Sequence, residues 1–234
     1  MSNDWFRFKK FLVNQDKCAM KVGTDAILLG SWCDLDKCNE VLDVGTGTGI
    51  VALMCAQRSV AKIIGIDIDP SAAIQARENF VGSLWSDRLT LIERDIRDHT
   101  IEKREFDLIV CNPPYFKSSL LSKDSVRNTA RHSSSIELED LIASIVPLLS
   151  PEGRFSLILP RDRFHEAERI LKFNNLHLAR RTDVSSNPDS KVFRVLSEWT
   201  FDEKKTFHSH IQISEKNSNL YHADYLELTK DFYL

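Results

Sequence analysis

The chain has 234 residues, of which 42% are hydrophobic and 28% are charged, a composition that excludes disordered and fibrous proteins. The net charge of −3 excludes a uniformly basic surface that coats nucleic acid, although local basic patches remain possible. The longest apolar run, residues 50–56, is far too short to span a bilayer, and the first residues lack the apolar core of a signal peptide. We therefore expect a cytoplasmic protein with no membrane partner.

Neither the cysteines nor the histidines form a pattern that is typical of metal or disulfide sites. The five cysteines are irregularly spaced and form no C-x-x-C pair, so we expect small buried thiols in a reducing compartment. His208 and His210 have no third candidate ligand nearby, so we expect no metal.

Strand-like and helix-like segments alternate from residue 41 onward. In chain order, the predicted strands cover residues 41–44, 62–66, 89–92, 106–111, 154–159, 176–184 and 191–200. The predicted helices between them cover residues 49–58, 70–81, 139–149 and 163–174. Apolar strands that alternate with helices predict a parallel sheet covered on both faces. We therefore expect a doubly wound, Rossmann-like α/β fold with a mostly parallel seven-stranded sheet and an antiparallel C-terminal strand pair.

No boundary divides the chain, so we expect a single domain. Its parts would be an N-terminal extension at residues 1–21, a core at 22–201 and a C-terminal tail at 202–234 that packs on the core. Parallel sheets of this kind bind ligands at the carboxyl ends of their strands, where we look for the site.

A glycine-rich turn joins the first predicted strand to the first helix. It reads D-x-G-x-G-x-G, from Asp43 through Gly45, Thr46 and Gly47 to Gly49. A dinucleotide loop requires G-x-G-x-x-G, and the position of its third glycine is occupied here by isoleucine. The Asp43 carboxylate would repel a pyrophosphate and attract an ammonium group. S-adenosylmethionine has an ammonium group and no phosphate, and its ribose hydroxyls could bond Asp67 at the end of the second strand.

This pattern resembles the class I methyltransferases, and the resemblance implies their fold and their cofactor, S-adenosylmethionine. It also implies that Asp95, after the third strand, contacts the adenine amine of the cofactor. Ile68 and Ile96, which follow the two acids, would line the same pocket.

A second motif, Asn112-Pro113-Pro114-Tyr115, directly follows the fourth predicted strand. The prolines have no N–H groups, so the turn presents oxygen acceptors in a stiff arrangement. The side-chain carbonyl of Asn112 and the main-chain carbonyl of Pro113 suit a planar exocyclic amine. Two hydrogen bonds would favour a pyramidal nitrogen, whose lone pair could attack a methyl group without a metal. Tyr115 could stack on a flat substrate.

The two motifs together resemble the amino-methyltransferases that act on adenine N6, guanine N2 or glutamine amide nitrogen. Over nearly the whole chain the sequence resembles the bacterial valine-tRNA adenine-N6 methyltransferases, and the matching segments are residues 11–16, 20–32, 42–49, 112–115, 130–132 and 228–234. The resemblance implies methylation of the adenine 3′ of the anticodon, position 37. It also implies that Lys21, Val22, Gly23 and Thr24 line the cofactor pocket. Asp67 stands where glutamate is common in that family, so it must reach the ribose from closer in.

Two segments carry a local excess of positive charge that would suit a tRNA partner. Residues 1–21 have five basic and two acidic side chains, interleaved with Trp5, Phe6, Phe8 and Phe11, and residues 117–132 have four basic and one acidic. Basic and aromatic residues together suit phosphates and unstacked bases. The candidate substrate-binding residues are Lys9, Lys10, Tyr115, Phe116, Lys117, Arg127 and Arg131.

Other readings use some of the same residues. A glutamine methyltransferase of a translation factor shares the Asn112–Tyr115 turn, but such enzymes carry a helical domain ahead of the core, and only about forty residues precede the glycine turn here. A guanine-N2 or adenine-N6 methyltransferase of ribosomal RNA, a non-catalytic binding module and an NAD oxidoreductase are the further alternatives. No obligate protein partner is evident.

Overall fold

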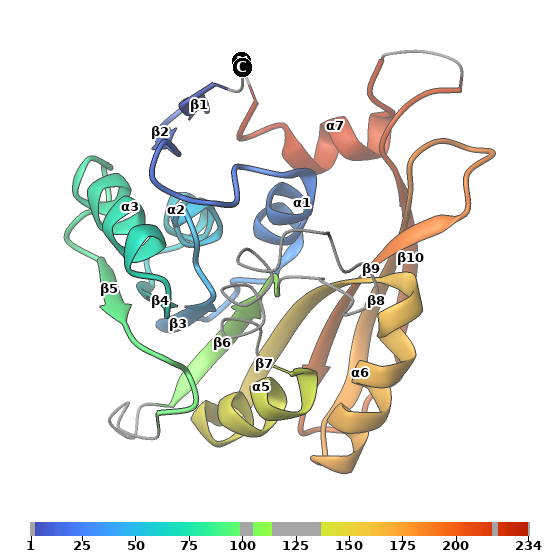
Figure 1. The fold of residues 1–234 in the computed structure, drawn as a ribbon. Coiled ribbons are helices and arrows are strands. Elements are labelled where there is room, and N and C mark those ends of the chain that lie inside the picture. The colour runs from blue at the N-terminus through green and yellow to red at the C-terminus, as the bar shows by residue number, and fades with distance from the viewer. Residues whose placement is uncertain (1–2, 99–104, 114–136, 217–219, 234) are drawn as a thin grey trace, which may run out of the picture.

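The structure is a computed structural model, and it describes residues 3–98, 105–113, 137–216 and 220–233. A sheet of eight strands crosses the described part of the protein in the order β10-β8-β9-β7-β6-β3-β4-β5 (Figure 1). The strands are β3 (Glu40–Val44), β4 (Lys62–Asp67), β5 (Leu89–Glu93), β6 (Phe106–Cys111), β7 (Leu149–Pro160), β8 (His177–Ser185), β9 (Val192–Thr200) and β10 (Phe207–Gln212). The five strands from β3 to β7 are parallel, and β9 runs antiparallel to both β7 and β8. This confirms the predicted doubly wound α/β fold.

Strand β10 is an eighth strand that the sequence did not predict. It pairs in parallel with β8 at the edge of the sheet, and of its six residues only Ile211 is buried. A strand with one buried residue lacks the apolar alternation by which strands are recognised. The predicted tail at residues 202–234 therefore contains a sheet strand.

Helices cover both faces of the sheet because the strands alternate their apolar side chains between the two faces. In β3, Val41 belongs to the core under α1 (Thr24–Trp32), α2 (Ile50–Arg58) and α3 (Pro70–Val81), whereas Leu42 and Val44 belong to the core under α5 (Leu138–Ile145) and α6 (Arg161–Phe173). A short 3-10 turn, Val146–Leu148, ends the stretch predicted as one helix at 139–149. Figure 1 shows α5 and α6 below the sheet and α1 and α2 above it.

The chain ends meet on the α1 side of the sheet. A hairpin of β1 (Trp5–Arg7) and β2 (Leu12–Asn14) lies against the end of the chain that follows α7 (Ala223–Thr229) (Figure 1). Phe8 and Phe11 are buried and stacked, with ring centroids 4.6 Å apart. The expectation that these two rings bind RNA bases is therefore wrong, because they form part of the core.

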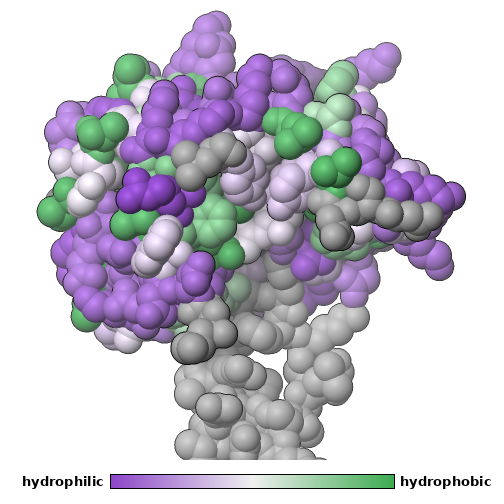
Figure 2. All heavy atoms as spheres, turned by 90° about the horizontal axis from the view of Figure 1, so that it is seen from above, coloured by the Kyte–Doolittle hydropathy of each residue, from purple (hydrophilic) through white to green (hydrophobic). Residues whose placement is uncertain are grey.

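The outer surface above α1 and α7 is mainly hydrophilic. Figure 2 shows this face as predominantly polar, with hydrophobic residues in small separate groups. Among the described residues, no helix is both long enough and apolar enough to cross a membrane.

Candidate active site

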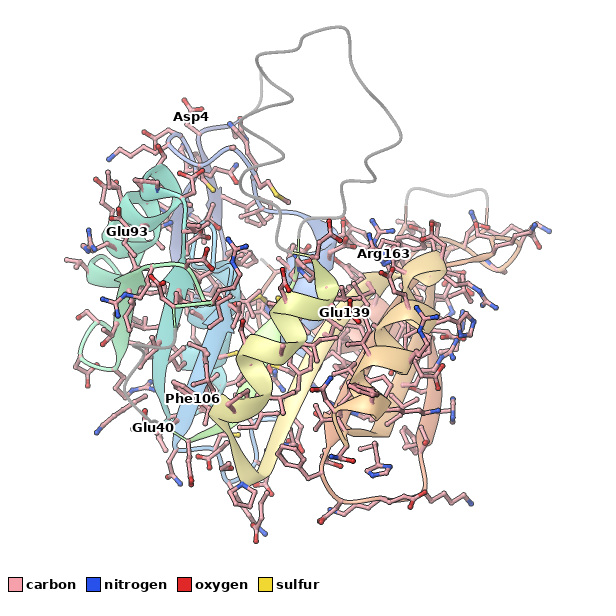
Figure 3. The ribbon with its side chains drawn as sticks, turned by 60° about the horizontal axis from the view of Figure 1, so that its bottom comes forward. Asp4, Glu40, Glu93, Phe106, Glu139 and Arg163 are labelled. Carbon is pink, nitrogen blue, oxygen red and sulfur yellow. The ribbon has the colours of Figure 1, made fainter. Side chains whose placement is uncertain are left out.

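A cavity of about 680 Å³ lies at the carboxyl ends of β3, β4, β5 and β6. This volume is in the range of small-molecule sites. Figure 3 shows Glu40 and Phe106, which begin β3 and β6, at the opposite end of the sheet from Arg163 and Asp4. The cavity therefore occupies the edge at which the glycine turn and the Asn112 turn both emerge.

Most of the predicted cofactor residues line this cavity. They are Lys21, Gly23, Thr24, Asp43, Gly45, Thr46, Gly47, Asp67, Ile68, Asp95, Ile96 and Asn112, and the predicted catalytic Pro113 joins them. Val22 and Gly49 are not part of the described lining. The Val22 N–H donates to Gln15 Oε1 at 2.8 Å, and Gly49 packs against Phe80. Both residues therefore contact the residues around the cavity and do not line it themselves.

The glycine turn is built from left-handed backbone. Gly45, Gly47 and Gly49 have φ values of 68°, 56° and 82°, a region that side chains with a Cβ rarely adopt. A Cβ on Gly45 would meet no atom within 4 Å, so the bare backbone faces open space. A Cβ on Gly49 would lie 2.5 Å from the Phe80 ring. The absence of a side chain at Gly45 thus leaves room for a ligand close to the backbone. The absence of a side chain at Gly49 allows Phe80 of α3 to pack against the turn.

Asp43 is buried at the base of the turn. Its Oδ2 accepts hydrogen bonds from Thr46 Oγ1 at 2.6 Å and from the Ala52 N–H at 3.1 Å. Burial raises the pKa of Asp43 to about 7, although these two bonds oppose the rise. The carboxyl is therefore partly protonated at neutral pH, and a cation in the cavity would favour its ionised form.

Asp67 ties the second strand to the turn. Its Oδ2 accepts from the Gly47 N–H at 2.8 Å and its Oδ1 from the Asp69 N–H at 2.9 Å. Burial raises the pKa of Asp67, and these backbone bonds oppose the rise. Asp69 in turn caps α3 by accepting from the Ser71 N–H at 2.7 Å, with Pro70 in the first helical position. A ribose at this edge would share the oxygens of Asp67 with the backbone.

Asp95 has a partner that sequence reasoning missed. The Arg97 guanidinium lies against its carboxylate, with Nε 3.0 Å from each oxygen. These bonds from Arg97 hold the pKa of Asp95 below its usual range. A ligand amine that bonds Asp95 must therefore share its oxygens with this guanidinium. An arginine two residues after an acid was the available signal.

The Asn112 side of the cavity extends toward β9. Asn112 and Pro113 follow β6 directly, with Leu141 of α5 nearby in the lining. Phe193 and Arg194 of β9 complete this wall and were not predicted. The predicted Pro114, Tyr115, Phe116, Lys117, Arg127 and Arg131 lie outside the described residues.

The two basic residues predicted at the N-terminus differ in their surroundings. The Lys9 N–H donates to the Phe232 carbonyl at 2.8 Å, and its Nζ bonds the Lys230 carbonyl, so Lys9 holds the end of the chain. Lys10 is exposed, and no described residue pairs with it. Among the described residues, no group of three or more His, Cys, Asp or Glu side chains could hold a metal ion.

Comparison with known proteins agrees with this geometry. Residues 41–153 match the family described as "Methyltransferase domain". The tRNA1(Val) (adenine(37)-N6)-methyltransferases of Bacteroides fragilis and Phocaeicola vulgatus are 40% and 43% identical to the chain, over 100% of this chain and 99% of each relative.

Solved structures share the fold at lower identity. A predicted O-methyltransferase from Agrobacterium tumefaciens is 18% identical with a TM-score of 0.69, covering 89% of this chain and 96% of that one. A glycopeptide N-methyltransferase in complex with S-adenosylmethionine is 15% identical with a TM-score of 0.52, covering 70% and 82%.

Proposed function

The chain belongs to the family of tRNA1(Val) (adenine(37)-N6)-methyltransferases, and from that premise we propose that it methylates the exocyclic N6 of adenine 37 in a valine tRNA, with S-adenosylmethionine as the methyl donor. The observation that carries the proposal is one continuous cavity. It brings Asn112 at the end of β6 together with Asp43, Asp67 and Asp95 at or just beyond the ends of β3, β4 and β5. Substrate tRNA implies a cytoplasmic enzyme.

The residues of the cavity fit S-adenosylmethionine. The bare backbone at Gly45 leaves room for a close ligand, and the buried Asp43 carboxyl offers a counter-charge to an ammonium group. Asp67 offers carboxylate oxygens to ribose hydroxyls, and Asp95 offers them to an adenine amine. The exposed Ile68 and the buried Ile96 supply apolar surface between the two acids. The wall of the cavity around the methionine part of S-adenosylmethionine would be formed by Lys21, Gly23 and Thr24.

When bound, S-adenosylmethionine supplies an electrophilic methyl group on a sulfonium. The chain's own part is to bring the adenine amine in line with it. Asn112 Oδ1 and the Pro113 carbonyl would each accept one N–H of the amine, which favours a pyramidal nitrogen and frees its lone pair. Pro113 has no N–H and so cannot donate to the nitrogen in competition. Pro114 would hold this carbonyl in place, and Tyr115 would stack on the base.

The remaining contacts to the tRNA come from predicted basic and aromatic residues. We assign Lys10, Phe116, Lys117, Arg127 and Arg131 to the tRNA, and these contacts would fix its orientation through phosphates and unstacked bases. Lys9 contributes to this surface only through the hairpin that it helps to hold.

The test incubates the protein and radiolabelled S-adenosylmethionine separately with bulk tRNA, with ribosomal RNA and with soluble cell protein, each from a strain that lacks the gene. The products are digested to nucleosides and amino acids. We expect label in N6-methyladenosine from tRNA. Label in methylglutamine would contradict the proposal and assign the chain to the glutamine methyltransferases, and label in ribosomal RNA would contradict the tRNA assignment.

A further inference from the structure

Residues 14–22 form an N-terminal strap that runs along α3 into the cavity. The Lys17 N–H donates to Gln75 Oε1 at 2.8 Å, and the Lys17 ammonium pairs with Glu78. The far end of the strap lines the cavity through Cys18, Ala19, Met20 and Lys21. One wall of the cavity is therefore a segment held against α3 by hydrogen bonds and an ion pair.

Gln15 closes the strap upon itself. Its Oε1 accepts from the Val22 N–H at 2.8 Å, and its Nε2 donates to the Asn3 carbonyl at 2.8 Å. The side chain is buried, so these bonds replace water for both backbone groups. The loop between Gln15 and Val22 is thus closed at its base before it reaches the cavity.

Asn79 makes the connection between the strap and the glycine turn. Its Oδ1 accepts from the Asn14 N–H at 2.9 Å, and its Nδ2 donates to the Asn14 carbonyl at 2.9 Å. The same Nδ2 donates to the Thr48 carbonyl at 2.8 Å, within the glycine turn. Only an amide has one acceptor and two donors in this arrangement, and the side chain is 3% exposed.

The next residue along α3 strengthens this connection. Phe80 packs against Gly49, where a Cβ would come within 2.5 Å of the ring, and against Gly65 in β4. Residues 79 and 80 therefore fix the glycine turn by a hydrogen bond and by close packing, while residues 75, 78 and 79 fix the strap. Both walls of the cavity depend on the same part of α3.

We propose that Asn79 is a positioning residue for cofactor binding, which holds the N-terminal strap and the glycine turn at their mutual spacing. This role rests on the proposed cofactor. Asn79 itself does not line the cavity, so it acts through the backbone of Asn14 and Thr48. Loss of its bonds would release the strap from one side of the cavity and the turn from the other.

The test compares Asn79→Leu, which has a similar shape and no polar atoms, with Asn79→Asp, which keeps the acceptor for the Asn14 N–H and loses both donors. Leu171→Ala is the matched control, because Leu171 is buried in α6 on the other face of the sheet. Each full-length variant is measured for its Tm, its Kd for S-adenosylmethionine by calorimetry, and its tryptic cleavage after Lys17 and Lys21 without ligand.

We expect Asn79→Leu to raise the Kd about tenfold or more and to speed cleavage in the strap, with Asn79→Asp intermediate. Leu171→Ala should lower the Tm at least as much as Asn79→Leu does. It should leave the Kd for S-adenosylmethionine and the rate of tryptic cleavage within about twofold of wild type. A wild-type Kd and wild-type cleavage in Asn79→Leu would overturn the proposal. If Asn79→Leu does not fold, unchanged values in Asn79→Asp would overturn it equally. If the wild type itself fails to bind S-adenosylmethionine, the proposed cofactor is wrong, and the cleavage of ligand-free variants still decides whether Asn79 holds the strap.

Discussion

Arg194 at the start of β9 donates from Nε to Oδ2 of Asp25 in the first turn of α1, at 2.8 Å. The two residues are 169 positions apart in the chain, and both line the cavity. The pair joins the helix after the strap to β9, which is separated from β6 and the Asn112 turn by β7. It therefore closes the wall of the cavity that α1 and β9 form together.

The ion pair between Asp25 and Arg194 should stabilise the fold. About a fifth to a quarter of each side chain is exposed, which places it between surface pairs and fully buried ones. We expect Asp25→Asn to lower the free energy of unfolding by roughly 1–2 kcal/mol. A double-mutant cycle with Arg194→Met in urea tests this value, and strictly additive effects would show that the pair contributes nothing.

Binding of the cofactor should release protons through Asp43. The pKa of this carboxyl is about 7 without ligand, so it is about half protonated at pH 7, and an ammonium group beside it favours ionisation. We expect S-adenosylmethionine to release about half a proton at pH 7. Calorimetry in buffers of different ionisation enthalpy measures this release, and Asp43→Asn should show none. Equal release by the two proteins would contradict the role of Asp43.

The same pKa predicts how stability depends on pH without ligand. The folded protein holds the Asp43 proton up to about pH 7, whereas the unfolded chain loses it near the ordinary aspartate pKa of 3.8. Between these values the folded state binds more protons, so the contribution of Asp43 to stability falls as pH rises and is fully unfavourable above 7. Asp43→Asn should therefore gain stability relative to wild type from pH 5 to pH 8, as thermal unfolding at each pH would show. A constant difference would contradict the raised pKa.

Asn112 should matter for turnover and little for cofactor affinity. Asn112→Ala removes the proposed amide acceptor, and loss of one such electrostatic contact in an active site typically costs about 10²–10³ in rate. We expect single-turnover methylation to fall by that factor, while the Kd for S-adenosylmethionine stays within about threefold. Near-wild-type turnover would rule out activation of the amine by Asn112.

Lys9 and Lys10 are adjacent in sequence and should behave differently. Lys10→Ala should weaken tRNA binding and reduce its salt dependence by about one counterion, as expected for one phosphate contact. Lys9→Ala should lower the Tm, because it frees the carbonyl of Lys230, and should leave tRNA affinity within about twofold. Filter binding at several salt concentrations separates the two, and equal effects on affinity would place both lysines on the RNA.

The sequence predicted the parts of the fold in which the apolar pattern is regular. All seven predicted strands are present, and the helix predicted at residues 70–81 is α3. Helix α1 was not predicted, because seven of its nine residues are buried and its sequence has no polar face. Gly30 lies where α1 packs closely against α2, since a Cβ there would lie 2.7 Å from Met54 Sδ of α2. Such close packing on all sides leaves no polar face by which the helix could be recognised.

The residues of the candidate site also divide into those that a local sequence pattern predicted and those that it did not. Residues of short motifs, such as Asp43 and Asp67, could be named because their spacing to a strand end fixes their place. Arg194 could not be named, since its partner Asp25 lies 169 positions earlier and only the fold brings the two together. Arg97 was missed, although its position two residues after Asp95 could have indicated the pairing. Phe8 and Phe11 were misinterpreted because a basic neighbourhood resembles an RNA-binding surface whether or not the rings between the charges are buried.

Methylation of adenine 37 is tested with a valine tRNA transcript and the same transcript with guanine in place of adenine 37. Each is incubated with wild-type protein and S-adenosylmethionine, and its nucleosides are analysed by mass spectrometry. We predict one N6-methyladenosine per tRNA in the first transcript and none in the second. Methylation of both transcripts to the same extent, or of neither while another substrate is methylated, would contradict the account.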